Sequence, residues 1–468
     1  MTDIRLINLP YQEELLTLFE SFRDLPLAIL LDSNHKSFSD TRFDILVADP
    51  LAILEAQESD HSLVWRNAPL YNIEPIGTPF DTLETLIHTI CKEPWAQKAS
   101  KDLPFTGGVL GYFSYDSGRY LETLPHNTIQ DVSIPKILAG LYGWAIISLH
   151  ESQETLLVLT PWCDESLEQS VLDRISSEPP RTIDSFELHT AFSSNMTADM
   201  YQEKFNRVKH YIRAGDCYQV NLAQRFSAKC QGDSFEAYRT LREACPTPFS
   251  AYVNLDNNQA ILSHSPERFV LCNDSQIESK PIKGTRPRGH TLEEDEKLAQ
   301  ELLESEKDRA ENLMIVDLLR NDMGRSCITG SIKVPKLFFL ESYANVHHLV
   351  STITGEIANT WEHFTVFKNG FPGGSITGAP KIRSMEIIDE LEPHTRSAYC
   401  GSIAYFSCNG QMDSSITIRT LIVDKDNIHC WAGGGLVLDS ICDEEYQETF
   451  TKVGKLTHTL EVNFHRSK

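Results

Sequence analysis

The sequence predicts an α+β fold in which large, mainly antiparallel β-sheets form a sandwich core flanked by helices. Residues 11–160 contain alternating apolar runs, such as those at 43–54 and 142–161, which are typical of strands. In the second half of the chain, helix-like patterns are separated by further strand-like runs. No internal repeat or low-complexity tract interrupts this order.

A polar, acidic segment divides the sequence. Residues 164–195 contain Pro179-Pro180 and few apolar side chains, a composition typical of a boundary. A chain of 468 residues can form one large domain or two unequal ones. We expect an N-terminal region over residues 1–175 and a second region over residues 190–462.

The second region begins with a well-marked helix. Asn195 or Thr197 can cap it, apolar residues recur on one stripe from Tyr201 to Ile212, and Gly215 marks its end. A strand is expected at 217–226. The remaining predicted helices cover residues 291–322, 379–391 and 443–460, and the remaining predicted strands cover residues 249–255, 259–272, 343–355, 399–407, 413–424 and 427–432.

Composition excludes several classes of function. The formal net charge of -24 disfavours nucleic acid or an anionic membrane as a partner. The longest apolar stretch, residues 138–149, is shorter than the roughly 18 residues that a membrane span needs. The first residues lack the basic end and apolar run of a signal peptide, so we expect a cytoplasmic protein. The eleven cysteines form no C-x-x-C pair and are expected to be reduced thiols.

An acidic residue stands in an apolar helix pattern at 307–322. The pattern is apolar over most of its circumference, so we expect a buried helix on which the charge of Glu311 is costly unless it is paired. A buried ion pair with Arg309, Arg320 or Arg325 is one interpretation. Metal ligation by Glu311 is the other.

The last predicted helix carries a row of charges. Glu445, Glu448 and Lys452 share one face, which is usually a solvated face. The glycines at 433–435, just before this helix, instead permit close approach to a ligand. Hard oxygen ligands spread over two helices suit Mg²⁺.

Two glycine-rich segments lack the features of nucleotide-binding loops. Residues 371–381 run into a helix with Pro380 in its first turn, a geometry that offers N–H groups to an anion. Ala379 and Pro380 stand where a phosphate-binding loop needs Lys and Ser or Thr, and residues 433–438 lack the third glycine of a dinucleotide fingerprint. Tight turning is the alternative for both segments.

Further polar residues lie at or near the predicted strand ends. Glu267 and Lys283, taken singly, would more often be surface charges. His347 and His348 are neighbours in a strand-like run and point to opposite faces. At most one of the two histidines is therefore expected to face a site.

A set of motifs in a fixed order closely resembles the chorismate-utilising enzyme family. The motifs are SPERF (265–269), PIKGT (281–285), KDRAEN (307–312), DLLRND (317–322), HHLVS (347–351), FPGGSITGAPK (371–381), GSIAYF (401–406), ITIRT (416–420), AGGG (432–435) and EYQET (445–449). The resemblance is strong over about residues 195–460 and implies the chorismate-utilising enzyme fold.

Two features point to one branch of this family. Lys283 resembles the nucleophilic lysine of aminodeoxychorismate synthases, where the anthranilate branch typically has Ala. Isochorismate and salicylate synthases also carry Lys there, but they usually lack the N-terminal motifs that residues 30–33 and 41–50 resemble. The alternatives are an isochorismate or anthranilate synthase, or a degenerate tryptophan-binding regulatory protein.

The resemblance implies a chemistry on chorismate that leads to p-aminobenzoate and folate. An unprotonated Lys283 would attack C2, and Glu267 would act as the general acid on the departing C4 oxygen. Ammonia would then add at C4 and expel the lysine. Mg²⁺ held by Glu311, Glu445 and Glu448 would bind the ring carboxylate.

The resemblance also implies the residues that bind the substrate. Arg419 and Lys452 would hold the enolpyruvyl carboxylate. The pocket would be lined by Thr285, Ser375, Tyr405 and the amides of Gly433, Gly434 and Gly435, with His348 near the C4 or pyruvyl end. No cysteine has the G-x-C-x-G context of a glutaminase, so a separate glutamine amidotransferase subunit is expected to supply the ammonia.

The N-terminal motifs resemble a tryptophan pocket of related enzymes. The candidate residues are Ser33, Asp40, Thr41, Arg42, Phe43, Pro248, Phe249 and Ser250. We expect a bound tryptophan to serve as a structural ligand. The alternative is that Ser33 caps a turn and Arg42 forms a surface ion pair.

Overall fold

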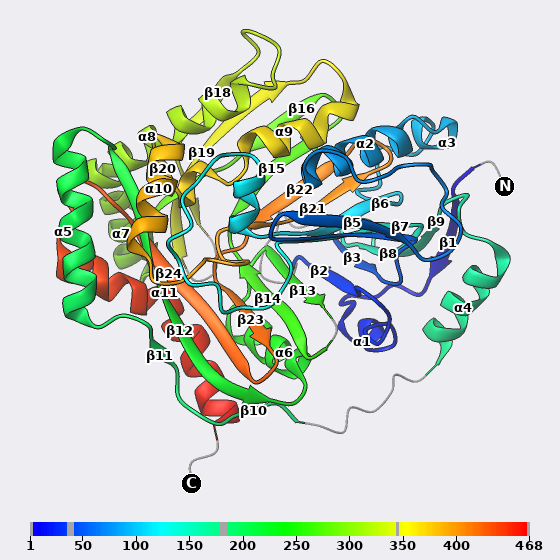
Figure 1. Ribbon diagram of the computed structural model, residues 1–468, viewed down its shortest axis with the longest axis horizontal. Coiled ribbons are helices and arrows are strands. Elements are labelled where there is room, and N and C mark those ends of the chain that lie inside the picture. The colour runs from blue at the N-terminus through cyan, green and yellow to red at the C-terminus, as the bar shows by residue number, and fades with distance from the viewer. Residues whose placement is uncertain (1–2, 35–41, 178–184, 256, 343–345, 466–468) are drawn as a thin grey trace.

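A computed structural model describes residues 3–34, 42–177, 185–255, 257–342 and 346–465. Within them, two large sheets are packed together and covered by helices (Figure 1). The helices are α1 (Leu16–Glu20), α2 (Pro79–Cys91), α3 (Pro94–Gln97), α4 (Glu165–Ser176), α5 (Ala198–Ala214), α6 (Ser234–Ala244), α7 (Leu292–Glu304), α8 (Glu306–Gly324), α9 (His363–Gly370), α10 (Lys381–Leu391) and α11 (Cys442–Phe464), with 3-10 turns η2 (Tyr115–Tyr120), η3 (Thr360–Glu362) and η4 (Gly374–Ile376).

The first sheet is built from both halves of the chain. Its order is β1 (Arg5–Leu9), β9 (Glu154–Leu159), β8 (Trp144–Leu149), β3 (Phe43–Val47), β2 (Ile29–Asp32), β13 (Phe249–Asn254), β14 (Gln259–Ser265), β23 (Thr420–Asp424), β24 (Asn427–Leu436), β12 (Gln219–Gln231) and β10 (Glu187–Leu188). Two short strands, β11 (Ser193–Ser194) and β20 (Gly378–Ala379), also pair with β12.

The second sheet also combines strands from both halves of the chain. Its order is β17 (Ile282–Pro287), β19 (Val346–Glu356), β16 (Gln276–Ser279), β15 (Arg268–Asn273), β22 (Met412–Ile416), β21 (Ser402–Ser407), β6 (Gly108–Phe113), β7 (Ile137–Tyr142), β4 (Ala52–Gln57) and β5 (Asp60–Trp65), and β18 (Lys333–Ser342) pairs with β19.

The predicted fold class is confirmed, because the strands of both sheets pair antiparallel with their neighbours and helices flank them. In Figure 1 the blue N-terminal strands β2 and β3 lie beside the green strands β13 and β14. Strands from before and after residues 164–195 thus share both sheets. The division of the chain into regions 1–175 and 190–462 stays a prediction.

Three runs that the sequence predicts to be strand-like are each divided into two strands. Residues 43–54, 259–272 and 413–424 each leave one sheet and enter the other, giving β3 and β4, β14 and β15, and β22 and β23. Alternation of apolar side chains is the same in both sheets, so it does not mark the crossing. Glu267 lies at the second crossing and Arg419, with φ of 50°, lies at the third.

The helix predicted over residues 291–322 is two helices. The chain breaks at Ser305, whose hydroxyl accepts a hydrogen bond from the Asp308 amide (3.2 Å) and caps α8. The expected burial of α8 holds for one face only, since Leu313 is 52% exposed while Ile315 and Leu319 are buried. One face of α8 packs against β17 and β19, and the opposite face meets solvent.

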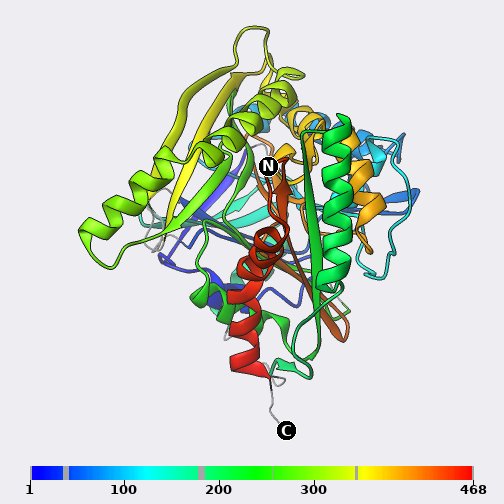
Figure 2. The ribbon, with the colours of Figure 1, turned by 90° about the vertical axis from the view of Figure 1, so that its left-hand side faces the viewer.

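The helix predicted after residue 195 is confirmed as α5. Thr197 caps its start by accepting from the Met200 amide (3.3 Å), and Gly215 ends it in the left-handed region with φ of 83°. Figure 2 shows α5 (green) and α11 (red) on the same face of the molecule. Within the described residues, no helix is long and apolar enough to cross a membrane.

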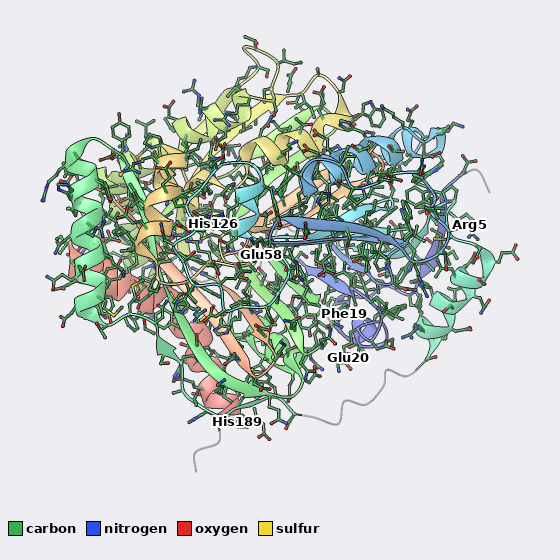
Figure 3. The ribbon with its side chains drawn as sticks, viewed as in Figure 1. Arg5, Phe19, Glu20, Glu58, His126 and His189 are labelled. Carbon is green, nitrogen blue, oxygen red and sulfur yellow. The ribbon has the colours of Figure 1, made fainter. Side chains whose placement is uncertain are left out.

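Burial follows the sequence pattern at the level of single residues. On α1, Phe19 packs against Phe235 and Tyr252, whereas the next residue, Glu20, pairs with Arg239 at the surface (Figure 3). Where α2 and α9 cover the second sheet, Phe113 of β6 is fully buried in an aromatic cluster. Its ring contacts Phe80, Phe367, Phe371 and Phe406, with centroid distances of 4.8–6.5 Å.

Replacing Phe113 with Ala should lower the free energy of unfolding by about 3–5 kcal/mol, because a cavity forms where the ring contacts are lost. Phe339→Ala is the matched control, since Phe339 on β18 is 49% exposed. Urea denaturation of both variants would measure the difference. Equal losses of stability would show that this cluster does not organise the core.

Candidate active site

Ser375 joins the two residues that are expected to do the chemistry. Its hydroxyl donates to Oε1 of Glu267 (2.9 Å), and its carbonyl oxygen accepts from Nζ of Lys283 (3.5 Å). Glu267 lies between β14 and β15, Lys283 on β17 and Ser375 in η4. Three segments distant in the sequence therefore converge on one serine.

The carboxyl of Glu267 is in an environment that favours its protonated form. The residue is 6% exposed, and burial raises the pKa of Glu267 above its ordinary value. The positive charge of Lys283, the Ser375 hydrogen bond and, more weakly, Lys452 oppose this rise. A carboxyl with a raised pKa next to a lysine is suited to general acid catalysis.

The segment that carries Ser375 is held at both ends. Lys381, at the start of α10, donates to the carbonyl of Gly370 (2.7 Å) and forms an ion pair with Asp322 of α8 (2.8 Å). At the other end β20 pairs with β12, where Gly378 has φ of 145° and a side chain would collide with the carbonyl of Gln219. The segment's position is thus tied to both α8 and β12.

Acidic side chains gather beside the glycine strand β24. A Cβ on Gly434 would stand 2.8 Å from Oε2 of Glu445 and 3.8 Å from Oε1 of Glu448. Glu445 accepts from the Ser440 hydroxyl (2.7 Å), and Glu448 pairs with Lys452 (2.6 Å). The two carboxylates of α11 therefore face the same glycine.

Glu311 of α8 belongs to the same electrostatic cluster. Burial raises the pKa of Glu311, Lys283 and Lys307 oppose the rise, and the negative charge of Glu445 adds to it. Burial and the charge of Glu448 likewise raise the pKa of Glu445. Repulsion among these carboxylates means that a cation at this position would be stabilised.

The carboxylates of this cluster are ligands of a type that suits a divalent cation, although they do not surround a single point. Among the described residues, no three Asp, Glu, His or Cys side chains stand close enough together to hold a metal ion. Lys452 lies against Glu448, where it lowers the pKa of Glu448 against the effect of desolvation by the surrounding protein, and Lys307 lies 4.0 Å from Glu445. Carboxylate oxygens are hard ligands of the kind that Mg²⁺ prefers.

Arg419 offers a cation for an anionic group. The side chain is exposed, yet desolvation by the surrounding protein lowers the pKa of Arg419. No carboxylate of the described residues forms an ion pair with it. Its charge in turn helps to lower the pKa of His348, so the two side chains are close.

His348 and Thr285 form a pair on neighbouring strands. Nδ1 of His348 lies 2.8 Å from the hydroxyl of Thr285, at facing positions of β19 and β17. Burial, assisted by Arg419 and His347, lowers the pKa of His348 to about 4. A neutral imidazole therefore stands beside Arg419 at neutral pH.

Comparison with known proteins identifies the family of the chain. The family model described as chorismate binding enzyme matches residues 28–458. Aminodeoxychorismate synthase component 1 of Salmonella typhimurium is 45% identical, and that of Escherichia coli is 46% identical, each over 95% of this chain and 95% of the relative. The chain belongs to the chorismate-binding enzyme family.

A solved structure of the same family shares the fold. Anthranilate synthase component I from Streptococcus pneumoniae superimposes with a TM-score of 0.77 at 30% identity, covering 89% of this chain and 92% of that one. Identity to the two aminodeoxychorismate synthase components is higher, at 45% and 46%. The family that the sequence motifs predict is thus confirmed.

The ring contacts of Tyr405 are with aromatic side chains. Its buried ring packs against Phe43 (6.4 Å between centroids) and Phe105 (5.9 Å). The second histidine, His347, hydrogen-bonds to Ser342 (2.7 Å) and Asp295 (3.0 Å) rather than to Thr285. Tyr405 therefore lies nearer to the residues expected to bind tryptophan.

The residues expected to bind tryptophan form a second cluster. The registers of β2 with β3 and of β2 with β13 place Ser33, just after β2, between Phe43 and Phe249. The amide and hydroxyl of Ser33 both donate to Asp44 (2.8 and 2.7 Å), and Arg268 lies over the Phe249 ring at 5.1 Å.

The other candidates of this cluster differ in exposure. Ser250 is buried with its hydroxyl 2.8 Å from that of Thr247, Pro248 is half-buried, and Arg42 is exposed. Asp40 and Thr41 lie outside the described residues.

Two polar residues beside the site were not predicted from the sequence. Gln219 of β12 is 1% exposed, lies against Gly435, and neither polar atom of its amide has a hydrogen-bond partner among the described residues. Arg396 is equally buried, behind the Ser375 segment. Polar residues recur along β12, so the sequence does not mark Gln219 as buried, and nothing near Arg396 in the sequence marks it as buried either.

The buried His348 should make stability depend on pH. Since the pKa of His348 is about 4 in the folded chain and about 6.5 when unfolded, the unfolded state binds more protons between these values. Stability is therefore lost as the pH falls from 6.5 towards 4, by roughly 3 kcal/mol at most from this group. His348→Gln should lose less stability over this window in urea titrations at several pH values. An identical pH dependence in wild type and variant would contradict the assigned burial of the imidazole.

Proposed function

We propose that the chain is the chorismate-converting subunit of an aminodeoxychorismate synthase, which replaces the C4 hydroxyl of chorismate with an amino group. The convergence of Lys283 and Glu267 on Ser375 is the observation that carries this proposal. The names and 45–46% identities of the two curated relatives support the same reaction. The product leads to p-aminobenzoate and folate.

In the first step Lys283 and Glu267 act as a pair. Transfer of a proton from the Lys283 ammonium to the Glu267 carboxylate yields an amine nucleophile and a neutral acid together. The amine forms a bond to C2 of chorismate, the ring double bonds shift, and the C4–O bond breaks. Glu267 gives its proton to the departing oxygen, which leaves as water.

In the second step ammonia reverses this allylic substitution. Its nitrogen forms a bond to C4, the double bonds shift back, and the C2–N bond to Lys283 breaks. A proton lost by the added ammonia returns to the lysine nitrogen or to Glu267. Two substitutions through a covalent intermediate thus replace one displacement of a poor leaving group.

We assign Glu311, Glu445 and Glu448 as the residues that would hold Mg²⁺. When bound, the ion would neutralise the ring carboxylate and withdraw charge from the π system. The closeness of Glu445 and Glu448 to Gly434 and the electrostatic effect of Glu445 on Glu311 support the assignment.

The remaining residues would orient the substrate. Arg419, which has no acidic partner among the described residues, and Lys452 would bind the enolpyruvyl carboxylate. Thr285, His348, Ser375 and the amides of Gly433, Gly434 and Gly435 would surround the ring. Tyr405, which packs against Phe43, would affect substrate binding through the residues of the second cluster.

The source of ammonia would be a glutamine amidotransferase subunit. The relatives are named component 1, which implies a further component in those enzymes. None of the eleven cysteines in this sequence stands in a glutaminase nucleophile motif. We further propose that the complex works in the cytoplasm, without nucleic acid or membrane as a partner.

Lys283→Ala should abolish amination, because the nucleophile is lost. Wild-type protein with chorismate, Mg²⁺ and ammonium should give an aminated chorismate that keeps its pyruvyl group, as identified by mass. Lys280→Ala is the matched control, since Lys280 interacts with Glu278 (3.7 Å) on the same segment. Anthranilate with released pyruvate, or isochorismate formed without ammonia, would overturn the proposed function, and full turnover by Lys283→Ala would remove covalent catalysis.

Glu448→Gln should raise the Mg²⁺ concentration needed for half-maximal rate by about tenfold or more, because a charged ligand is lost. Unfolding stability should change by less than about 0.5 kcal/mol, since the side chain is 46% exposed. Glu444→Gln, an exposed neighbour on α11, serves as the control. An unchanged Mg²⁺ requirement in Glu448→Gln would show that Glu448 belongs to a solvated charged face and not to a metal site.

We also propose that the second cluster, from Ser33 to Tyr405, holds a tryptophan as a structural ligand. Its indole would lie near Phe249 and Pro248, and Ser33 with nearby backbone groups would meet its polar end. Tryptophan added to refolded, ligand-free protein should raise the melting temperature without inhibiting amination. The proposal fails if denatured protein releases no tryptophan and the added amino acid produces no thermal shift.

A further inference from the structure

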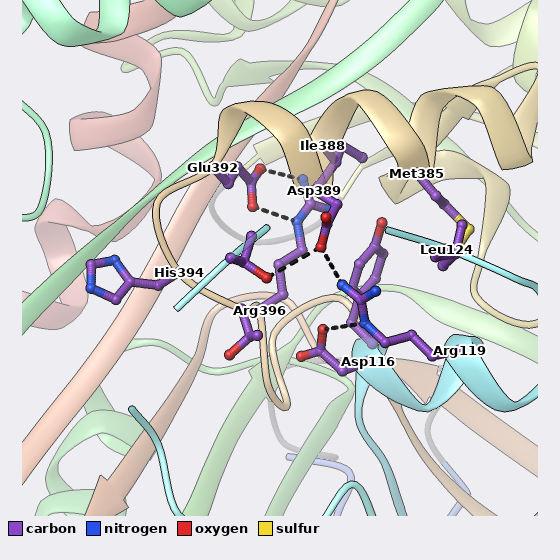
Figure 4. Close-up of a pocket in the computed structure, with 12 residues that line it drawn as sticks. Asp116, Arg119, Leu124, Met385, Ile388, Asp389, Glu392, His394 and Arg396 are labelled. Carbon is purple, nitrogen blue, oxygen red and sulfur yellow. Dashed lines mark hydrogen bonds and ion pairs between the residues drawn. The ribbon is translucent and has the colours of Figure 1, made fainter. Parts of the chain in front are cut away.

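A buried arginine stands behind the segment that carries Ser375. Arg396 is 1% exposed, and its guanidinium forms a two-point ion pair with Glu392 (2.6 and 2.9 Å) (Figure 4). The rings of Tyr115 and Tyr399 lie 4.7 and 5.7 Å from the guanidinium carbon. The pair is thus held rigidly in the interior.

The two Nη groups of Arg396 also donate hydrogen bonds to two backbone segments beside the site. One Nη donates to the carbonyl of Ile376 (2.9 Å), the residue that follows Ser375. The other donates to the carbonyl of Asn221 (2.9 Å) on β12, directly opposite Gly435 of β24. One side chain therefore connects the Ser375 segment to the strand that supports the glycines.

Glu392 completes this connection. Its Oε1 accepts from the amide of Ala223 (2.8 Å), which faces Gly433 on β24. That amide would otherwise be a buried donor without a partner, which is costly. The Arg396–Glu392 pair thus fixes β12 at two positions and the Ser375 segment at one.

We propose that Arg396 is a positioning residue for the amination reaction, which locks the Ser375 segment to β12 so that Ser375 keeps Glu267 and Lys283 in reacting geometry. The proposal rests on the proposed function, in which these two residues exchange a proton. Among the described residues, Arg396 contacts neither Glu267 nor Lys283. It acts on them through Ile376 and Ser375. The pair is therefore part of the machinery although it lies outside the substrate site.

Replacing the fork of Arg396 with a single ammonium in Arg396→Lys removes the simultaneous hold on Glu392, Ile376 and Asn221. Displacement of a catalytic group by about 1 Å costs up to about a hundredfold in rate, so kcat should fall by ten- to a hundredfold while KM for chorismate changes less. Because the Ser375 hydrogen bond lowers the pKa of Glu267, its loss should raise that pKa. The alkaline limb of the kcat profile should therefore move to higher pH.

Ser375→Ala removes the same hydrogen bond directly and should produce the same pH shift. If Arg396 acts through Ser375, the double variant should be no slower than the slower single variant, as a double-mutant cycle would measure. Arg119→Lys is the matched control, because Arg119 and Arg396 line the same small cavity and Arg119 forms ion pairs with Asp116 and Asp389 (Figure 4). That variant should leave the pH profile unchanged.

A second readout does not depend on turnover. Hydrogen exchange followed by mass spectrometry should show faster exchange over residues 371–380 in Arg396→Lys than in Arg119→Lys. If Arg396→Lys does not fold, Glu392→Gln keeps the shape of the pair while removing its charge and should give the same exchange pattern and pH shift.

Additive effects in the cycle, an unchanged pH profile, or unchanged exchange over residues 371–380 would each overturn the positioning role. A wild-type protein that does not aminate chorismate would instead overturn the proposed function. The exchange comparison would then still decide whether Arg396 holds the segment.

Discussion

Burial of Glu267 where the chain crosses from one sheet to the other is the constraint on which the site depends. At this crossing the carboxyl is removed from solvent, which raises the pKa of Glu267, and Ser375 gives it a hydrogen bond. The same serine receives Lys283 through its backbone carbonyl. Fixing Ser375 therefore fixes Glu267 and Lys283, the proposed acid and nucleophile, together, and Lys381 and Arg396 anchor the segment that carries Ser375.

Electrostatics explain how a strongly acidic chain can bind a dianionic substrate. The formal charge is -24, so an anion is repelled by most of the surface. At the site, however, Lys283 opposes the raised pKa of Glu311, and Lys452 forms an ion pair with Glu448. The positive charge of Arg419 acts on the nearby His348. A divalent cation placed among Glu311, Glu445 and Glu448 would complete the local reversal of charge.

Much of the fold and of the site could be predicted from the sequence, for identifiable reasons. The helix α5 has strong caps at Thr197 and Gly215, and its apolar stripe has helical period. The crossings at Glu267 and Arg419 could not be seen, because strands of both sheets alternate alike. Arg396 was missed because its burial depends on contacts with Ile376 and Asn221, which are distant in the sequence. Tyr405 was grouped with the substrate site by its motif, whereas its neighbours are Phe43 and Phe105.

The central claim is that Lys283 and Glu267, joined by Ser375, act as nucleophile and acid on chorismate. Rapid quenching of the protein with chorismate and Mg²⁺, without ammonium, followed by peptide mass analysis, tests it most directly. The account predicts an adduct with the mass of chorismate minus water on Lys283, which disappears as aminated chorismate forms when ammonium is added. Full amination by a protein that never carries this adduct on Lys283 would contradict it.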